Sequence, residues 1–266
     1  MRLTISHNTG YAYDHPVTDG LQQLRLRPSN SLLQTVHSWT VGIEGGRVEA
    51  QFTDQHGNTV DLISIIPGVT EIKVTCSGDV ETHDQSGVAG LHSSPTPLWH
   101  FCRQTALTKP GPAMKALLKS FSPHADDDVA RLHALSNHIL AAVRYNADAT
   151  HAATTAEEAV KEEHGVCQDH AHVFLSLARE LGYPARYVSG YLMMNDRVEQ
   201  DATHAWAEAH VDGLGWVGFD VSNAISPDGR YVTVATGLDY SEAAPVSGLV
   251  VGGTAESMIV SVQVQQ

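Results

Sequence analysis

The sequence of 266 residues contains few cysteines, few basic residues and no long apolar run. Its three cysteines, Cys76, Cys102 and Cys167, are widely spaced and form no C-x-x-C pair, which argues against a disulfide framework. Lys and Arg number 16 against 30 Asp and Glu, for a formal charge of −14, and they form no basic run that could follow a phosphate backbone. We therefore expect no nucleic-acid partner.

Apolar runs are short throughout the chain. No stretch approaches the roughly 18 to 20 residues that span a bilayer. Residues 1–7 are not followed by the apolar block of a secretory signal. We therefore expect a cytoplasmic protein with no membrane partner. At roughly 150 residues per domain, the length suits one large domain or two modest ones.

Two patterns divide the chain. Residues 1–82 alternate apolar and polar residues with period two, which predicts an N-terminal antiparallel β-sandwich-like domain. The composition then shifts to small and polar residues, so residues 83–110 are predicted to hold a linker and a first helical segment. Residues 111–266 show helical spacing followed by strands, which predicts an α+β fold. The predicted helices are 112–121, 125–143 and 155–163, and the predicted strands are 185–192, 204–211, 216–221, 231–235 and 257–264.

The segment 164–184 predicts a helix that begins at a cysteine. Gly182 and Pro184 are a helix stop signal, and residues spaced three or four apart run back from Leu181 to Cys167 on one face. The partial positive charge of a helix N-terminus stabilises a thiolate, and its free N–H groups can bind an oxyanion during acyl transfer. Cys167 is therefore either an activated nucleophile or a small buried structural cysteine, and this segment supports both equally.

The segment 201–220 predicts a β-hairpin. With a three-residue loop at 211–213, His204 lies directly opposite Asp220, where a carboxylate can accept a hydrogen bond from the imidazole and orient it. A two-residue loop at Gly213-Leu214 would place Asp220 on the other face of the strand. A histidine that is hydrogen-bonded for structural reasons alone is the alternative to a catalytic base.

Alternation along 204–210 also predicts the two faces of this strand. His204, Trp206 and Glu208 share one face. The other face is small and could be covered by a helix, because it carries Ala205, Ala207 and Ala209.

Three motifs in this order resemble the bacterial transglutaminase-like superfamily. They are Gly165-Val166-Cys167-Gln168-Asp169 leading to Gly182-Tyr183-Pro184-Ala185-Arg186, then His204-Ala205-Trp206-Ala207-Glu208, and finally Gly215-Trp216-Val217-Gly218-Phe219-Asp220. Residues 1–82 look like the β-rich N-terminal domain of that family, so the resemblance covers nearly the whole chain.

The resemblance implies a papain-related Cys-His-Asp fold, in which a cysteine on a helix packs against an antiparallel sheet. Cys167 would be the nucleophile, His204 the general base and acid, and Asp220 the residue that orients His204. The hairpin spacing leads independently to the same pairing of His204 with Asp220.

Three further residues are candidates for substrate binding: Gln168, Tyr191 and Trp206. Aromatic residues on strands more often pack in a core than line a groove, so the two aromatic assignments compete with a structural role.

Two positions depart from the superfamily's usual pattern. The family usually continues Asp-Pro-Thr-Asn at the acidic position, whereas this chain has Asp220-Val221-Ser222-Asn223. A bulky aromatic residue is common where this chain has His170. Neither change removes a catalytic group.

The histidines near Cys167 could also be zinc ligands, because a borderline-soft ion prefers Cys and His at short spacing. His170 shares a helix face with Cys167, but His172 points elsewhere, and His164 precedes the helix. We therefore expect no metal and no cofactor.

These features predict a thiol-dependent acyl-transfer enzyme that acts on amide or peptide bonds through an acyl-enzyme. We favour hydrolysis, by a cysteine peptidase or amidase, of a peptide or protein substrate that carries a carboxamide. The alternatives are transamidation of protein glutamine, as in a transglutaminase, and a noncatalytic transglutaminase-like binding module.

Overall fold

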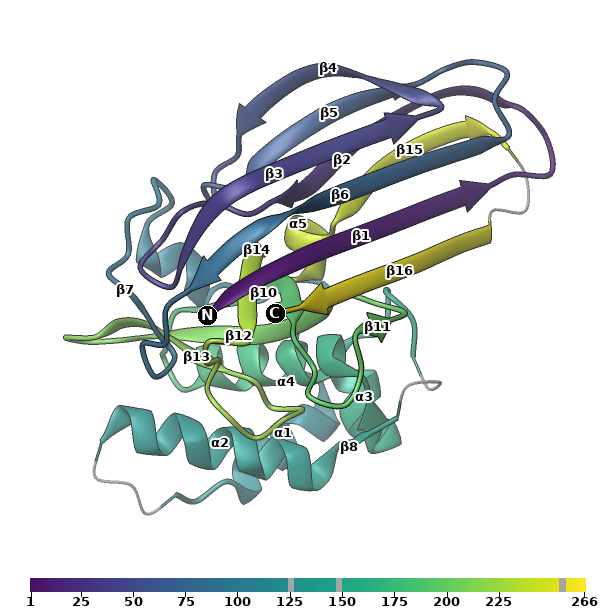
Figure 1. Ribbon diagram of the computed structural model, residues 1–266. Helices are drawn as coiled ribbons and strands as arrows, with labels where there is room; N and C mark the ends of the chain where they lie inside the picture. Colours follow the sequence, from purple (N-terminus) through teal and green to yellow (C-terminus); the bar gives the residue numbers. More distant parts are fainter. Residues whose placement is uncertain (124–126, 147–149, 254–256) are drawn as a thin grey trace.

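The computed structural model describes residues 1–123, 127–146, 150–253 and 257–266. A β-sandwich lies against a second layer, in which helices cover an antiparallel sheet (Figure 1). This arrangement confirms the predicted α+β fold with a β-rich N-terminal part.

The sandwich consists of two antiparallel sheets. One has the order β11 (Glu199–Gln200), β16 (Ser257–Gln265), β1 (Arg2–Ala12), β6 (Glu71–Thr82) and β3 (Gln34–Glu44). The other has the order β15 (Val246–Gly252), β2 (Val17–Arg27), β5 (Thr59–Ile65) and β4 (Gly46–Thr53). Period-two alternation turns Leu3 and Ile5 of β1 and Val80 of β6 to one face, where all three are fully buried together with Tyr191 and Val232 of the second domain. The strands predicted within residues 1–82 are therefore present.

Strands from the end of the chain complete both sheets. β16 pairs with β1 along nine residues, from Ala12 and Ser257 to Thr4 and Gln265, and β15 pairs with β2. These two strands therefore lie in the sandwich, although the sequence analysis grouped residues 111–266 in the second domain and predicted no strand at 246–252. Alternation identifies a strand but not its partner, because partners that are far apart in sequence leave no local signal.

The second domain is built on a sheet with the order β14 (Tyr231–Gly237), β10 (Ala185–Leu192), β12 (His204–Val211), β13 (Gly215–Phe219) and β7 (Val88–Gly90). Its helices are α1 (Pro112–Ser120), α2 (Asp128–Ala142), α3 (Ala156–Glu162), α4 (Cys167–Glu180) and α5 (Tyr240–Ala243). Two short strands, β8 (Arg144–Tyr145) and β9 (His164–Gly165), pair in parallel. No helix in the described ranges is both long and apolar enough to cross a membrane.

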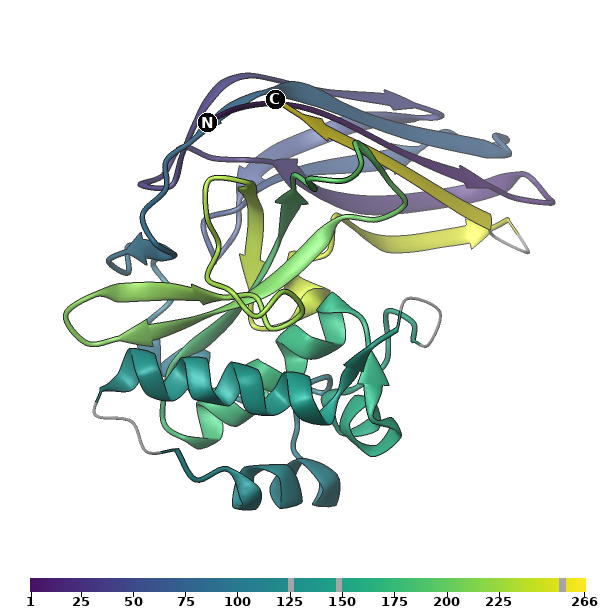
Figure 2. The same ribbon diagram turned by 60° about the horizontal axis from the view of Figure 1, so that its bottom comes forward.

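The helix α4 packs on the small face of β12, as predicted. Ala205, Ala207 and Ala209 are buried in the same core as Phe174 and Leu177 of α4. Because alanine side chains are short, the helix can lie close to the strand. In Figure 2 the helices lie on one side of this sheet and the sandwich on the other.

The segment 83–110 is more structured than an exposed linker. It contains the strand β7, which pairs with β13 at the edge of the second domain's sheet, and a 3₁₀ helix, η1 (Leu98–Cys102). The strand β7 was not predicted from the sequence, because this part of the chain has few large apolar residues.

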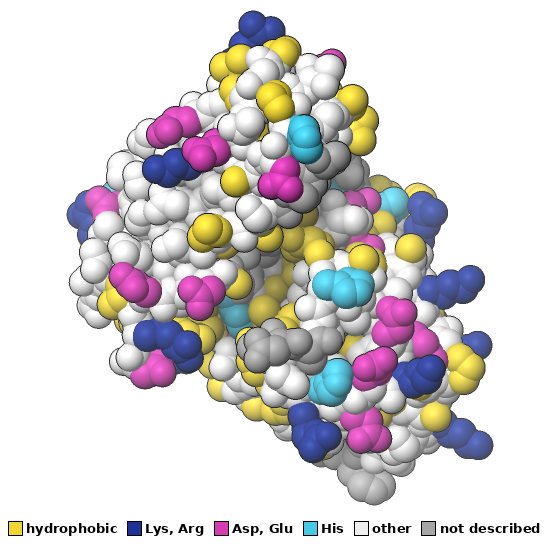
Figure 3. Space-filling model, turned by 90° about the vertical axis from the view of Figure 1, so that its right-hand side faces the viewer, with side chains coloured by type: hydrophobic (Ala, Val, Ile, Leu, Met, Phe, Trp, Pro, Cys, Tyr) yellow, Lys and Arg dark blue, Asp and Glu magenta, His cyan; other side chains and the backbone are white. Residues whose placement is uncertain are grey.

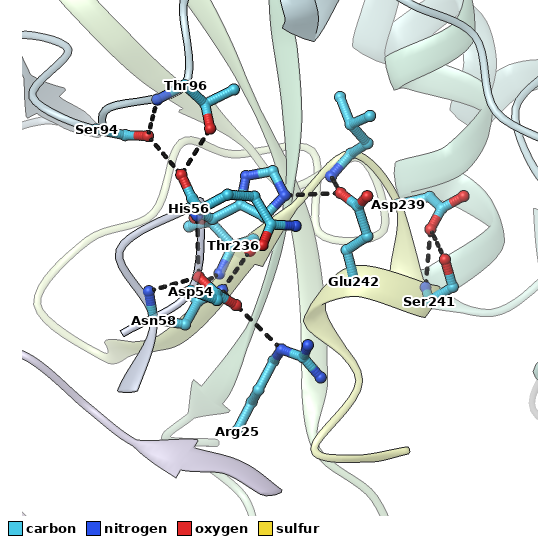
Figure 4. Close-up of polar contacts among 12 residues, drawn as sticks. Arg25, Asp54, His56, Asn58, Ser94, Thr96, Thr236, Asp239, Ser241 and Glu242 are labelled. Carbon is cyan, nitrogen blue, oxygen red and sulfur yellow. Dashed lines mark hydrogen bonds and ion pairs between the residues drawn. The ribbon is translucent and has the colours of Figure 1, made fainter. Parts of the chain in front are cut away.

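A turn of the sandwich reaches into the second domain (Figure 4). The turn lies between β4 and β5, and Asp54 shapes it by accepting hydrogen bonds from the backbone of His56 and Asn58. The Asn58 amide donates to the carbonyl of Thr236 in β14 at 2.7 Å and accepts from the Thr236 N–H at 2.8 Å. His56 Nε2 lies 2.7 Å from the Glu242 carboxylate in α5. These buried contacts join the two domains.

Replacing Asn58 by Ala should lower the free energy of unfolding by about 2–4 kcal/mol, because both backbone groups of Thr236 lose their buried partner. Urea unfolding followed by circular dichroism would measure the change. Asn195→Ala, at an exposed position, is the matched control and should leave stability unchanged. A loss below about 0.5 kcal/mol in the Asn58 variant would contradict this account.

Candidate active site

The helix α4 begins at Cys167, as the sequence predicts, and ends at Glu180, one residue before the predicted end. Gly182 has φ +92°, a left-handed conformation that glycine adopts without strain and that stops the helix. At the other end, the carboxylate of Asp169 accepts hydrogen bonds from the Val166 N–H at 2.8 Å and the Thr150 hydroxyl at 2.6 Å. Asp169 thereby holds the backbone immediately before Cys167.

His204 and Asp220 are hydrogen-bonded. His204 Nε2 lies 2.6 Å from Asp220 Oδ2, and the two side chains are 11 % and 1 % exposed. Because Nε2 faces the carboxylate, Nδ1 is the nitrogen left to exchange a proton with another group. The predicted pairing of histidine with acid is therefore present.

Asp220 is also held by two residues that the sequence analysis did not assign to the site. Oδ2 accepts hydrogen bonds from the Tyr231 hydroxyl and the Asn223 amide, both at 2.7 Å, and Oδ1 accepts from the Asn223 N–H at 3.2 Å. Burial raises the pKa of Asp220, but the hydrogen bond and charge of His204 and the bonds from Asn223 and Tyr231 outweigh it, so the pKa is lowered. The carboxylate is thus kept ionised.

Cys167 lies next to the His204 ring. Burial lowers the pKa of His204, but the charge of Cys167 and the hydrogen bonds with Asp220 and Cys167 raise it to about 10. The structure thus brings the three residues Cys167, His204 and Asp220 together, with the imidazole between the thiol and the carboxylate. This is the arrangement in which an imidazole can take the proton of a neighbouring thiol.

The hairpin that carries His204 has a different register from the predicted one. The ladder pairs Ala207 with Phe219 and His210 with Trp216, two residues away from the predicted pairs. The loop is 212–214, because Gly215 as well as Gly213 takes a positive φ. Since a shift of two residues keeps every side chain on its face, His204 and the residue after Phe219 still meet, diagonally and not directly opposite each other.

The three candidate substrate-binding residues lie in different places. Gln168 follows Cys167, and its amide donates to the carbonyl of Ala152 at 3.0 Å. The Trp206 ring stacks beside His204, with centroids 6.2 Å apart. Tyr191 is not at the site, because it is buried against the sandwich with its hydroxyl 2.9 Å from His7 Nδ1.

Trp206 has room beside His204 because β10 has a glycine there. A Cβ on Gly190 would lie 2.7 Å from the Trp206 ring and still closer to the carbonyl oxygen of Val232. Trp206 is buried, and its ring also lies edge-on to Tyr231 at 5.4 Å. The wall behind His204 is therefore aromatic.

The histidines considered as zinc ligands have other partners. His170 Nε2 donates to the Val143 carbonyl at 2.9 Å, and His172 Nε2 accepts from the Tyr240 N–H at 3.1 Å. Burial lowers the pKa of both rings, to about 4 for His172. Within the described residues, no three His, Cys, Asp or Glu side chains are grouped as ligands for one metal ion.

The face that carries α3 and β11 is hollowed, with hydrophobic and histidine side chains around the hollow (Figure 3). A cavity of about 180 Å³ adjoins α3 and β9, just before the start of α4. Its wall is largely polar and consists of Thr150, His151, Thr154, Glu158, Ala159, Glu162 and His164.

Asn223 and Tyr231 left only weak signals in the sequence. Asn223 stands three residues after Asp220, a spacing at which an acidic side chain often bonds a turn, and Tyr231 begins a predicted strand. Their convergence on one carboxylate depends on how the strand β14 lies in the sheet, which no local pattern shows.

Comparison with known proteins places these observations in a family. Residues 115–221 match the family described as the transglutaminase-like superfamily, and residues 3–81 match the bacterial transglutaminase-like N-terminal region. Uncharacterized proteins of Mycobacterium leprae and Mycobacterium tuberculosis are each 28% identical over 99% of this chain, which covers 98% and 92% of their lengths. A crystal structure from Cytophaga hutchinsonii, provisionally named a cysteine protease, has a TM-score of 0.78 and 23% identity, covering 100% of this chain and 90% of its own.

Iodoacetamide should label Cys167 first below pH 7. Cys167 lies at the start of α4 beside His204, a base that can take its proton, whereas burial raises the pKa of Cys76 to about 12 and also raises the pKa of Cys102. Timed labelling followed by peptide mass spectrometry would compare the three cysteines in one sample. Slow labelling at equal rates would show that Cys167 is not activated.

Proposed function

Because this chain belongs to the transglutaminase-like superfamily and carries its bacterial N-terminal region, we propose that it is a thiol-dependent acyl-transfer enzyme. Cys167 is the nucleophile, His204 the general base and acid, and Asp220 the residue that orients His204. The observation that carries this proposal is the position of the His204 ring. It is hydrogen-bonded to Asp220 at 2.6 Å on one side and lies beside the Cys167 thiol on the other.

In the proposed reaction the Cys167 thiolate attacks the carbonyl carbon of an amide or peptide bond. The free N–H groups in the first turn of α4 face the oxyanion that forms. His204 then donates its proton to the leaving nitrogen, the C–N bond breaks, and an acyl-enzyme remains on the sulfur. Asp220 keeps the imidazole in one orientation throughout, because Asn223 and Tyr231 hold the carboxylate itself.

We favour water as the acceptor that releases the acyl group, so that the enzyme is a cysteine peptidase or amidase. The His204 side chain is 11 % exposed, so the ring is not fully sealed from solvent. Transamidation needs an acceptor channel that excludes water from the acyl-enzyme. The provisional name of the Cytophaga hutchinsonii relative is consistent with hydrolysis.

The proposed substrate is a peptide or protein that carries a carboxamide. Gln168, beside the nucleophile, is the residue we propose to contact it, whereas the buried Trp206 ring supports His204 from behind. Transfer to a lysine-type amine is the second candidate reaction, since both begin with the same acyl-enzyme.

Asp220→Asn should reduce the turnover rate by about 10²–10⁴-fold, because an amide cannot hold the imidazole in the same tautomer and charge state. The folded state should persist, since Asn223 and Tyr231 can still bond the amide oxygen. Steady-state kinetics on a cleaved peptide would measure the loss, with Asp212→Asn at the exposed hairpin loop as the control. Wild-type activity in Asp220→Asn would refute the role given to this residue.

Hydrolysis and transamidation should be separable by product mass. The protein would be incubated with a library of glutamine-containing peptides, with and without a primary amine, and the products followed by mass spectrometry. We expect deamidated or cleaved peptides in both samples, and none with Cys167→Ala. Amine adducts that replace the hydrolysis products would establish transamidation, and no Cys167-dependent product would support the noncatalytic binding module.

A further inference from the structure

The two departures from the superfamily pattern are in contact with each other. His170 lies one turn after Cys167 on α4, and Ser222 lies two residues after Asp220. The Ser222 hydroxyl is 2.8 Å from His170 Nδ1. A link therefore runs from the nucleophile helix to the segment that carries the acid.

The hydrogen-bond direction at His170 is fixed by its other partner. Nε2 lies 2.9 Å from the carbonyl oxygen of Val143, which can only accept, so Nε2 carries the proton. Nδ1 is then an acceptor, and the Ser222 hydroxyl donates to it. Because the ring is fully buried and burial lowers its pKa, His170 stays neutral in this one tautomer near pH 7.

His170 thus joins three segments. Val143 is the residue that ends α2, His170 belongs to the first turn of α4, and Ser222 belongs to the segment after β13. That segment is closed on itself, because Asp220 pairs with Ile225 through backbone hydrogen bonds and binds Asn223 through its carboxylate. Ser222 is the point at which this closed turn is bonded to α4.

We propose that the Ser222–His170 hydrogen bond is a positioning contact that aligns Asp220 and His204 with Cys167. The inference rests on the proposed function, since it assigns these two residues a part in the same reaction. Asn223 and Tyr231 hold the carboxylate, and Phe219 stacks on Phe174 further along α4. The Ser222–His170 bond adds a polar link from the turn to the first turn of α4, next to the sulfur. Loss of the bond lets the acid and the imidazole shift together away from the thiolate, while the fold stays intact.

The test measures Cys167 alkylation by iodoacetamide from pH 5 to 9, which requires no knowledge of the substrate. Ser222→Ala should slow labelling at pH 6.5 by about tenfold and move the pH profile upward, because a displaced imidazolium stabilises the thiolate less. Ser222→Thr, which keeps the hydroxyl, should restore the wild-type profile. His170→Phe should resemble Ser222→Ala, and the double variant should be no slower than the slower single variant.

Ser120→Ala is the matched control. Its hydroxyl also bonds a histidine, His138 Nε2 at 3.1 Å, but this pair joins α1 to α2. It should leave the labelling profile unchanged. Circular dichroism of every variant checks that the fold is retained.

The outcomes separate this inference from the proposed function. If Cys167 of the wild type labels no faster than Cys76 and Cys102, the proposed function fails. If the wild type labels fast and Ser222→Ala matches it, or if the two single effects multiply in the double variant, the positioning role is overturned. A tenfold loss in Ser222→Ala that Ser222→Thr does not restore also overturns it, because the hydroxyl is then not the cause.

Discussion

The hydrogen bond between His204 and Asp220 is the contact on which the rest of the site depends. An imidazole can serve a neighbouring thiol only if one nitrogen is held by an acceptor and the other is left to face the sulfur. Asp220 meets the first condition because it is buried and bonded by Asn223 and Tyr231 as well as by His204. The strand β14, which supplies Tyr231, and the turn after β13 are therefore parts of the proposed active site.

The elements near the site could be predicted because each has a strong local signal. The bounds of β10 and β12 agree with the sequence prediction at both ends, and α4 starts at the predicted residue. The hairpin register was wrong by two residues, because Gly213 suggested a three-residue loop at 211–213, whereas the loop of the same length lies one residue later, with positive φ at Gly213 and Gly215. The site survived this error because strand faces repeat every two residues, so His204 and Asp220 stayed on the same side.

Features that depend on distant contacts could not be predicted. Tyr191 has the same local pattern as a groove residue, but its hydroxyl bonds His7 from the first strand of the chain. The partners of β15 and β16 lie more than 200 residues earlier in the sequence. Likewise, His170 and Ser222 lie in two separate departures from the superfamily's usual sequence pattern. Only the folded chain shows that they are hydrogen-bond partners.

The return of the chain to the sandwich has a consequence for biosynthesis. A ribosome finishes β1 and β2 early, but the strands that cover one side of each are made only after the whole catalytic layer. During that interval both strands present bare backbone groups that can pair with other nascent chains. The protein therefore has a long window of exposure to aggregation, in which chaperone binding to the unfinished sheets would have the greatest benefit.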